Sequence, residues 1–428
     1  MTAPTEDDGM DVEALKRDAC AAIDAMAGDL VAVSHYIHAN PELAFKEEKA
    51  AARLTAEVER AGLAVERGAY GVGTAFASAF GKPGAPEVGI LSEYDALPGI
   101  GHSCGHNVIA TIGLGAALGL AKLGARLPGR VRYLGTPAEE AGGGKEFMAQ
   151  NGAFDGLDAA MMVHSAGFDI ETMPCICVAT VDVVYEGVPA HASAMPHKGV
   201  NALDALVIAY QGIAALRQHI PQSERLHGII TDGGQAANIV PARAAGQWFV
   251  RAPDAASLAR LKKRVEGCFQ AGAFATGAKA DIKWAAVDYL DLKTSWPLAK
   301  SYRRNAEALG RTFLDLDTLP AGMAGSTDMG NVSHRVPSIH PMIAVGPANV
   351  VIHHPDFAAH AISPKGDRAA IDGAKALAMT SIDLFCDPAL RAETRAGFEA
   401  SAGESRAALA TAFNAAGRME AVGGCGCC

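Results

Sequence analysis

The sequence lacks the features that mark several classes of protein. Its 428 residues carry 37 Lys and Arg against 47 Asp and Glu, a formal net charge of −10. A basic face that would neutralise phosphates is therefore not expected, which argues against a nucleic-acid partner. The first residues, MTAPTEDDGMDVEALKRD, contain neither the basic nor the apolar region of a secretory signal. The most apolar helical stretch, residues 109–123, is shorter than a membrane span, so no membrane partner is expected.

Disulfide spacing is also missing. The nine cysteines are spread along the chain without a framework pattern, which favours a reducing, cytoplasmic setting. Cys425, Cys427 and Cys428 end the chain in GGCGCC, a sequence compatible with a metal-binding cluster or with a flexible tail. The chain is too long for one average core, so two domains are expected.

Helical and strand patterns alternate over most of the chain. Apolar spacing predicts one long amphipathic helix over 11–39, and later helices over 298–309 and 363–385. Strands are predicted within 86–97, 130–135 and 158–167. This order predicts an α/β catalytic domain with a mostly parallel sheet and helices on both faces.

The pattern changes near residue 178. Strand, helix, two strands, helix and strand follow one another as far as residue 291. This βαββαβ order is that of a ferredoxin-like α+β unit with an antiparallel sheet. We therefore predict that residues 1–177 begin the catalytic domain, that 178–291 form an inserted lid, and that 292–428 complete the catalytic domain and form a tail.

A candidate metal loop follows the first of these strands, in SEYDALPGIGHSCGHN. It places His102, Cys104 and His106 close together, and thiolate and imidazole are ligands that zinc prefers. All three are too close to bind one ion without strain. A turn at Gly105 would point Cys104 and His106 to one site, so these two are the expected pair.

Further ligand types follow the other strands. Glu139 and Glu140 are adjacent carboxylates that cannot both be buried and ionised cheaply without a cation. One would bind metal while the other acts as a general base. His164 ends the strand in MMVHSAG, and either His353 or His354 could complete the set. These donors outnumber the needs of one tetrahedral ion and suit two ions that share a bridging thiolate.

The inserted unit contributes polar groups of another kind. His191, Asn238 and Arg251 do not resemble metal ligands. An imidazole, an amide and a guanidinium could stabilise an oxyanion and hold a substrate carboxylate. Surface polar residues would look the same in the sequence.

Ordered motifs from residue 38 to residue 357 carry a family resemblance. They are HANPELAFKEEKAA, SEYDALPGIGHSCGHN, GTPAEEAGGGK, MMVHSAG, GVPAHASAMPHKGVNALDA, GGQAANIVP, GSTDMGNVSHRVPSIHP and HHPDF. They resemble the dinuclear metallopeptidases of the aminoacylase/carboxypeptidase type, in particular the amidohydrolase branch. That branch includes hippurate hydrolase, auxin-conjugate hydrolases, aminobenzoyl-glutamate hydrolase and dipeptidase-like members.

The resemblance implies a role for each candidate residue. The implied metal ligands are the bridging Cys104, with His106 and His164 on one ion and Glu140 and His353 on the other. Glu139 matches the general base, and Asp95 matches the acid that orients the site. His191 matches an oxyanion-stabilising residue, often supplied across a dimer interface, and Asn238 and Arg251 match substrate contacts.

The predicted function is therefore cleavage of an amide bond by a metal-activated water and a Glu base. The expected small-molecule substrate is an N-acyl amino acid, a dipeptide or an aminobenzoyl-glutamate-like conjugate. The expected cofactors are two divalent ions per subunit, zinc or alternatively manganese or cobalt, and a homodimer through the lid is implied. A cysteine-nucleophile amidase using Cys104 and a non-catalytic metal-binding protein remain as alternatives.

Overall fold

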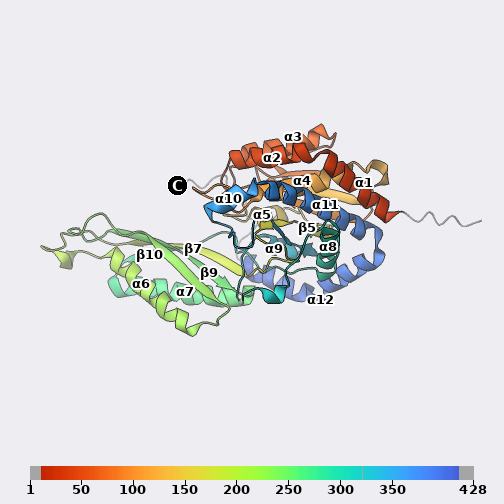
Figure 1. Ribbon diagram of the computed structural model, residues 1–428. Coiled ribbons are helices and arrows are strands. Elements are labelled where there is room, and N and C mark those ends of the chain that lie inside the picture. The colour runs from red at the N-terminus through yellow and green to blue at the C-terminus, as the bar shows by residue number, and fades with distance from the viewer. Residues whose placement is uncertain (1–10, 321, 414–428) are drawn as a thin grey trace, which may run out of the picture.

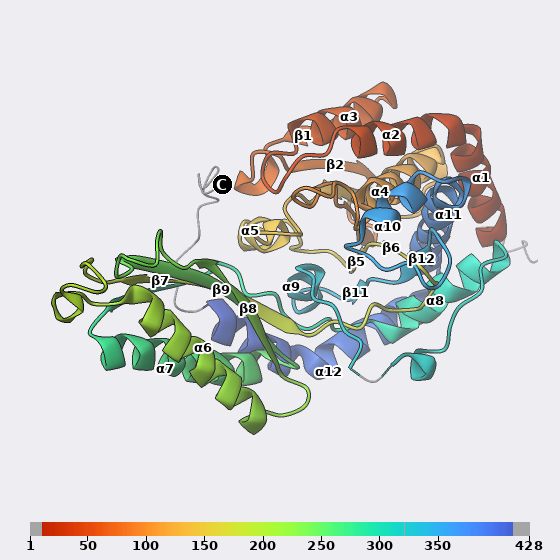
Figure 2. The same cartoon turned by 60° about the vertical axis from the view of Figure 1, so that its left-hand side comes forward.

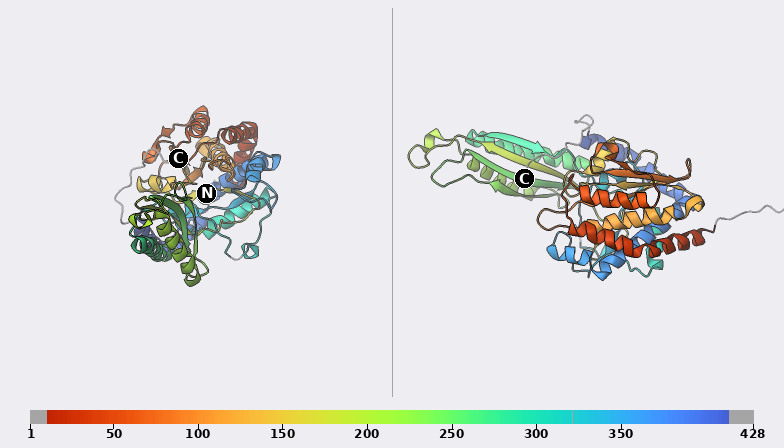
Figure 3. Two further views of the ribbon diagram at one scale, coloured as in Figure 1. Left: turned by 90° about the vertical axis from the view of Figure 1, so that its left-hand side faces the viewer. Right: turned by 90° about the horizontal axis from the view of Figure 1, so that it is seen from above.

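Residues 11–320 and 322–413 are described by the computed structural model, shown in Figure 1. The cysteines of the GGCGCC sequence lie outside these residues. A body of mixed helices and strands occupies one end of the molecule, and a narrower arm of strands and two helices projects from it (Figures 1 and 3).

The body is built on a six-stranded sheet of order β1-β2-β4-β3-β5-β11. Its strands are β1 (Glu66–Arg67), β2 (Phe76–Gly81), β3 (Glu87–Ser92), β4 (Arg130–Gly135), β5 (Ala159–Met161) and β11 (Ser338–Ile339). Strands β4, β3, β5 and β11 run parallel to their neighbours, whereas β1 and β2 form the predicted antiparallel hairpin. The predicted mostly parallel sheet is therefore confirmed.

Both faces of this sheet are buried. On β3, Val88 and Ile90 belong to the core beneath α4 (His106–Ala121) and α11 (Pro364–Cys386), whereas Leu91 belongs to the opposite core. That second core includes Phe147 from α5 (Gly144–Gln150) and Met329 from α9 (Met329–Ser333). Strands buried on both faces read as continuous apolar runs, which explains why this region was recognisable in the sequence.

Two predicted elements are divided in the structure. The expected helix over 11–39 is two helices, α1 (Val12–Ala25) and α2 (Ala27–Ala39), bent by 58°. Met26 caps α1 through its N–H, and its carbonyl accepts from Leu30, so one helix ends where the next begins. The apolar spacing continues across the bend because both helices pack on α4.

The strand predicted over 158–167 is likewise two strands. β5 joins the six-stranded sheet, whereas β6 (His164–Ala166) pairs in parallel with β12 (Met342–Ala344) in a separate sheet. The remaining helices of the body are α3 (Glu48–Arg60), α8 (Trp296–Ala308), α10 (Pro355–Ala361) and α12 (Pro388–Phe413).

The arm has the predicted βαββαβ order. Its elements are β7 (Cys177–Glu186), α6 (Ala202–Leu216), β8 (Arg225–Asp232), β9 (Arg243–Ala252), α7 (Ala255–Thr276) and β10 (Lys279–Trp284). The sheet order is β10-β7-β9-β8 and every pairing is antiparallel. Helices α6 and α7 cover one face (Figure 2), and Trp248 and Phe269 are buried beneath them. The domain boundaries at residues 178 and 291 stay a prediction.

Helix α12 links the arm to the body. It contacts α8 and α11 of the body and α7 of the arm (Figure 2). Leu409 and Phe413 near its C-terminal end pack against the hydrophobic core of the arm. The last described helix therefore spans the junction between the two units.

Within the described residues, no single helix is long and apolar enough to cross a bilayer. Only α1 and α2 taken together, as a bent pair, satisfy the length and composition of a span.

Candidate metal centre

The predicted ligand types meet at the carboxyl edge of the parallel strands. Glu93 and Asp95 follow β3, Glu139 and Glu140 follow β4, and His164 begins β6 shortly after β5. Open α/β sheets place ligands at this edge because the loops after several parallel strands converge there.

The loop before α4 is shaped by Gly105. This residue has φ +77°, and a Cβ there would lie 2.2 Å from Oγ of Ser165. The Ser165 hydroxyl donates to the carbonyl of Cys104 at 2.7 Å, which holds the loop against β6. Because only glycine fits this turn, Cys104 and His106 on either side of it are directed to one site.

Cys104, His106 and His164 form the first group of donors. One ligand atom from each lies within 4.8 Å of the others, and Sγ of Cys104 is 3.4 Å from Nε2 of His164. The other ring nitrogen of each histidine is already held: Nδ1 of His106 by Asp95 at 3.1 Å, and Nδ1 of His164 by a carbonyl at 2.7 Å. This arrangement leaves both Nε2 atoms facing the site, as metal-binding histidines require.

Cys104, Glu140 and His353 form the second group within the same 4.8 Å limit. Nε2 of His353 is 3.5 Å from Oε2 of Glu140, and its backbone N–H donates to Ser103 at 2.8 Å. His354 instead faces Asp356 and caps α10. The structure therefore places His353, and not His354, at the centre, and Cys104 is the donor shared by the two groups.

Three buried atoms at this centre have no hydrogen-bond partner. They are Oε2 of Glu93, Nε2 of His106 and Oε1 of Glu140. Both carboxylate atoms lie 3.7 Å from Nε2 of His106. Buried polar atoms without partners are costly, and their convergence fits a cation that would satisfy them.

The protonation of the donors is set largely by burial. Burial lowers the pKa of His164 to about 4, which keeps the ring neutral and able to bind metal. Burial opposes the charge on Glu140, but the hydrogen bond from His353 and the charge of His106 outweigh it and lower its pKa. Burial likewise opposes the charge on Asp95, yet His106 holds the pKa of that carboxyl below its usual value.

Glu139 occupies a different position from Glu140. Its Oε2 is 3.9 Å from Nε2 of His106, and it belongs to neither group that contains Cys104. Burial, followed by the charge of Glu93, raises its pKa well above the usual range, which suits a proton carrier. The preceding Ala138 has φ +62°, and its N–H donates to the buried Glu47 carboxylate at 2.9 Å. Local strain that aims a side chain in this way is typical of functional sites.

His102 joins none of the donor groups found among the described residues. Its buried ring lies 6.2 Å from that of His38, and burial lowers its pKa to about 3. This position agrees with the expectation that Cys104 and His106 are the ligand pair of the loop.

The arm residues are placed differently from one another. Arg251 on β9 donates to the Ser326 hydroxyl of the body at 2.8 Å, so it lies at the junction of the two units. His191 and Asn238 are exposed in neighbouring loops of the arm, where the Asn238 carbonyl accepts from Ala192 at 3.0 Å. In the part of the chain that the structure describes, neither contacts the donor groups, so their roles stay predictions.

Sequence reasoning gave no role at this centre to Glu93, Lys145 or Asp328. All three side chains are fully buried, and Lys145 contacts both carboxylates. The signal was a lysine in the glycine-rich turn directly after the Glu pair, within AEEAGGGK. Nothing in the sequence alone showed that Asp328, far along the chain, would meet it.

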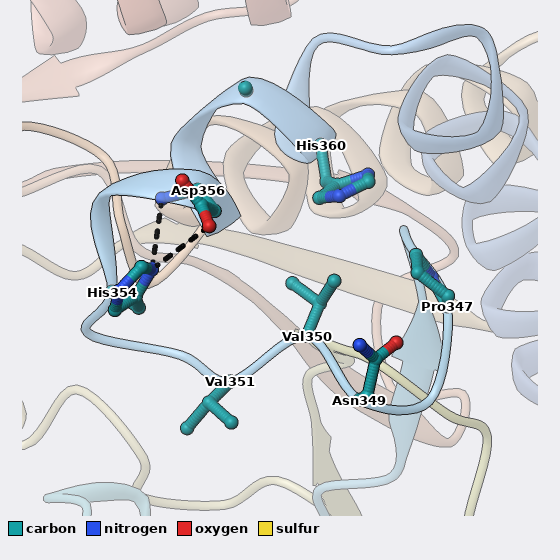
Figure 4. A pocket seen from close by; sticks show the side chains of 8 residues that line it. Pro347, Asn349, Val350, Val351, His354, Asp356 and His360 are labelled. Atoms are coloured by element: carbon teal, nitrogen blue, oxygen red, sulfur yellow. Dashed lines mark hydrogen bonds and ion pairs between the residues drawn. The ribbon is translucent and has the colours of Figure 1, made fainter.

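A cavity of about 550 Å³ lies beside the segment that carries His353 (Figure 4). Its lining residues are Pro347, Asn349, Val350, Val351, His354, Asp356, Ala359 and His360. In Figure 4 His354 points toward Asp356, consistent with its capping role. None of the donors is among these residues, so this cavity is not the metal centre.

The model of peptidase family M20/M25/M40 matches residues 89–377, which is more than half of the chain. This chain belongs to that family. Xaa-Arg dipeptidase of Mus musculus is 40% identical to the M20 chain over 410 residues, covering 92% of this chain and 95% of that protein. A p-aminobenzoyl-glutamate hydrolase polypeptide of Escherichia coli (strain K12) is 28% identical over 439 residues, covering 84% and 90%.

The fold of this M20 protein is shared by solved structures. A Bacillus subtilis protein described as a dinuclear metal binding peptidase of the M20 family superposes with a TM-score of 0.63 at 20% identity, covering 85% of this chain and 99% of that one. The predicted activity class is confirmed: this M20 protein is a metal-dependent hydrolase of amide bonds.

Proposed function

We propose that this M20 protein is a dipeptidase that cleaves an amide bond with the help of two divalent cations. The observation that carries the hydrolytic centre is a pair of donor groups sharing Cys104, beside a buried Glu139 that joins neither. The dipeptide preference is supported by the 40% identity to a mouse protein named Xaa-Arg dipeptidase. N-acyl amino acids and aminobenzoyl-glutamate-like conjugates form the second substrate class.

The donor set fits two ions, held by Cys104, His106 and His164 and by Cys104, Glu140 and His353. When bound, such cations would polarise the substrate carbonyl and acidify a water. Zinc is supported by the thiolate and imidazole donors, with manganese or cobalt as alternatives.

The side chains around the ions have distinct tasks. Glu139 removes a proton from the attacking water and delivers it to the leaving amine nitrogen. Asp95 fixes the ring of His106 through Nδ1 and, through its second oxygen, accepts from the Glu140 N–H at 2.8 Å. One carboxylate therefore orients a candidate ligand of each ion.

Arg251 is the proposed anchor for a substrate carboxylate. Its guanidinium is partly buried, and its hydrogen-bond partners are the neutral Ser326 hydroxyl and the His227 ring. A planar guanidinium without a carboxylate partner of its own suits bidentate recognition of a carboxylate. Conversion of Arg251 to Met should raise KM for dipeptides and leave KM for dipeptide amides, which lack that carboxylate, little changed.

A cysteine-nucleophile mechanism is less well supported. Burial, and then the charge of Glu140, raises the pKa of the Cys104 thiol well above its usual value, the opposite of an activated nucleophile. It also leaves the neighbouring Glu139 without a task. Full activity after removal of metal by EDTA, together with loss of activity on treatment with iodoacetamide, would favour that alternative over ours.

The test of the proposal is a turnover screen on metal-depleted protein with Zn²⁺, Mn²⁺ or Co²⁺ added back. The panel would include Xaa-Arg and Xaa-Lys dipeptides, dipeptides ending in neutral and acidic residues, N-acyl amino acids and aminobenzoyl-glutamate. We expect metal-dependent cleavage that is fastest for the basic dipeptides. Cleavage confined to aminobenzoyl-glutamate or to N-acyl amino acids would reject the dipeptidase assignment.

We also propose a homodimer formed through the arm and a cytoplasmic location. Strand β8 is an edge strand, and it carries Ile229 with 62% of its surface exposed, while Val188 and Ile239 nearby in the arm are also exposed. Such an edge is suited to pairing with a second chain. Light scattering would test the dimer, and mixing His191→Ala with Glu139→Gln subunits would test whether His191 acts across it. The shared thiolate requires a reducing compartment, and cell fractionation would test the location.

A further inference from the structure

A third cluster of acidic groups lies beside the two donor groups. One carboxylate oxygen each from Glu93, Glu139 and Asp328 lies within 4.8 Å of the others, and all three side chains are buried. Three carboxylates this close cannot all remain ionised in a buried site without a cation. By chemistry and spacing alone, the cluster would be a further cation site.

The ammonium of Lys145 lies in this cluster. It donates to Oε1 of Glu93 and, at 2.6 Å, to Oδ1 of Asp328, and the Lys145 backbone N–H donates to the other oxygen of Asp328 at 3.0 Å. Lys145 is 0% exposed. Its place is fixed by the tight turn before it, since a Cβ at Gly144 would lie 1.9 Å from the carbonyl of Pro137.

The charge on Lys145 is held by its neighbours. Burial opposes it, but Asp328 and Glu93 outweigh burial and raise the pKa of the ammonium above its usual value. Lys145 thus satisfies Asp328 completely and one oxygen of Glu93. The second oxygen of Glu93 has no partner and lies 3.7 Å from Nε2 of His106, so Lys145 also directs that oxygen toward the first donor group.

We propose that Lys145 is the resident cation of the Glu93–Glu139–Asp328 cluster and keeps a third divalent ion out of it. Lys145 is a positioning residue, because it acts through the carboxylates. A divalent ion in this cluster would engage Glu139 and occupy the lone pair that accepts a proton from water. The ammonium donates instead to Glu93 and Asp328, so Glu139 remains free to carry the proton. This inference rests on the proposed role of Glu139 as the base.

The test counts metal ions and does not depend on turnover. Wild-type protein and Lys145→Met would be equilibrated with Zn²⁺ or Mn²⁺, passed through gel filtration and analysed by mass spectrometry for metal per chain. We expect two ions for wild type and three for Lys145→Met. The double variant Lys145→Met/Asp328→Asn should return to two, because it removes a carboxylate from the cluster.

A matched control is Lys262→Met in the arm. Lys262 also forms a partly buried ion pair, at 2.8 Å from Asp288, but it lies outside the donor groups. This variant loses an ion pair and should still bind two ions. A folded Lys145→Met protein that binds no more ions than wild type would overturn the proposal.

A second measurement covers the case in which Lys145→Met is too unstable to purify without metal. Its thermal unfolding would be followed against Mn²⁺ concentration, and we expect added Mn²⁺ to raise its Tm more than it raises the Tm of wild type or Lys262→Met. Equal shifts for the three proteins would also overturn the proposal. Failure of the proposed function would look different: wild type would show no metal-dependent cleavage, while the difference in metal count between the variants would persist.

Discussion

Nε2 of His353 lies 3.5 Å from Oε2 of Glu140, joining two residues that are far apart in the chain. The His353 backbone has φ +65°, and the side chain is half exposed. Its N–H donates to the carbonyl of Ser103, within the loop that also carries Cys104. A strained residue on an irregular segment therefore completes the second donor group.

This geometry predicts different metal losses for two substitutions. Cys104→Ala should weaken both ions, because Cys104 belongs to both groups, whereas His353→Ala should weaken only one. Loss of an orienting partner alone typically costs 10–100-fold in metal affinity, so we expect a loss of about 100-fold or more for a direct ligand. Competition titration with a chelating dye would measure both steps, and His354→Ala is the control that should bind metal normally.

Glu139→Gln should abolish turnover without emptying the site. The amide keeps the size of the side chain but cannot accept and release the proton, and general-base catalysis contributes about 10²–10⁴-fold. We expect kcat to fall by that factor with metal content close to wild type. Retention of the wild-type rate would show that another group is the base.

Gly105→Ala should disrupt the metal loop. The backbone at φ +77° would cost about 1–3 kcal/mol for a residue with a side chain, and the new Cβ would also collide with Ser165. Gly99→Ala is the matched control, because its φ is +75° but nothing lies within 4 Å of the added Cβ. Chemical unfolding should show the larger loss of stability for Gly105→Ala, accompanied by loss of metal. Equal effects of the two substitutions would argue against the contact with Ser165.

Glu47 should make the metal-free protein less stable as the pH rises. Burial, followed by the charge of Asp95, raises the pKa of Glu47 from 4.5 to about 7. The folded state therefore prefers the protonated acid. This contribution is fully present below about pH 4.5 and is lost as the pH rises to about 7, a change of up to about 3 kcal/mol.

Glu47→Gln isolates this contribution. The amide oxygen can still accept from the N–H groups of Phe45 and Ala138, but it does not titrate. Between pH 5 and pH 7.5, denaturant unfolding should therefore show a smaller loss of stability for Glu47→Gln than for wild type. Parallel pH profiles for the two proteins would exclude Glu47 as the source.

The sequence was informative where side-chain pattern and local structure coincide. Strands buried on both faces produced continuous apolar runs, and the parallel sheet was predicted correctly. The βαββαβ order of the arm followed from alternation between strand and helix periodicity. The bend at Met26 was missed because α1 and α2 present their apolar faces to the same partner helix, so the spacing shows no break.

The chemistry of this protein could be read from its sequence: the donors Cys104 and His106, the Glu139–Glu140 pair and His164 each follow a recognisable strand. The choice between His353 and His354 could not, because adjacent residues differ only in the direction that the backbone gives them. That choice depends on a hydrogen bond to Ser103 and a positive φ. Tertiary structure also decided that Lys145 meets Glu93 and Asp328, since burial and charge pairing between distant segments arise only when the chain has folded.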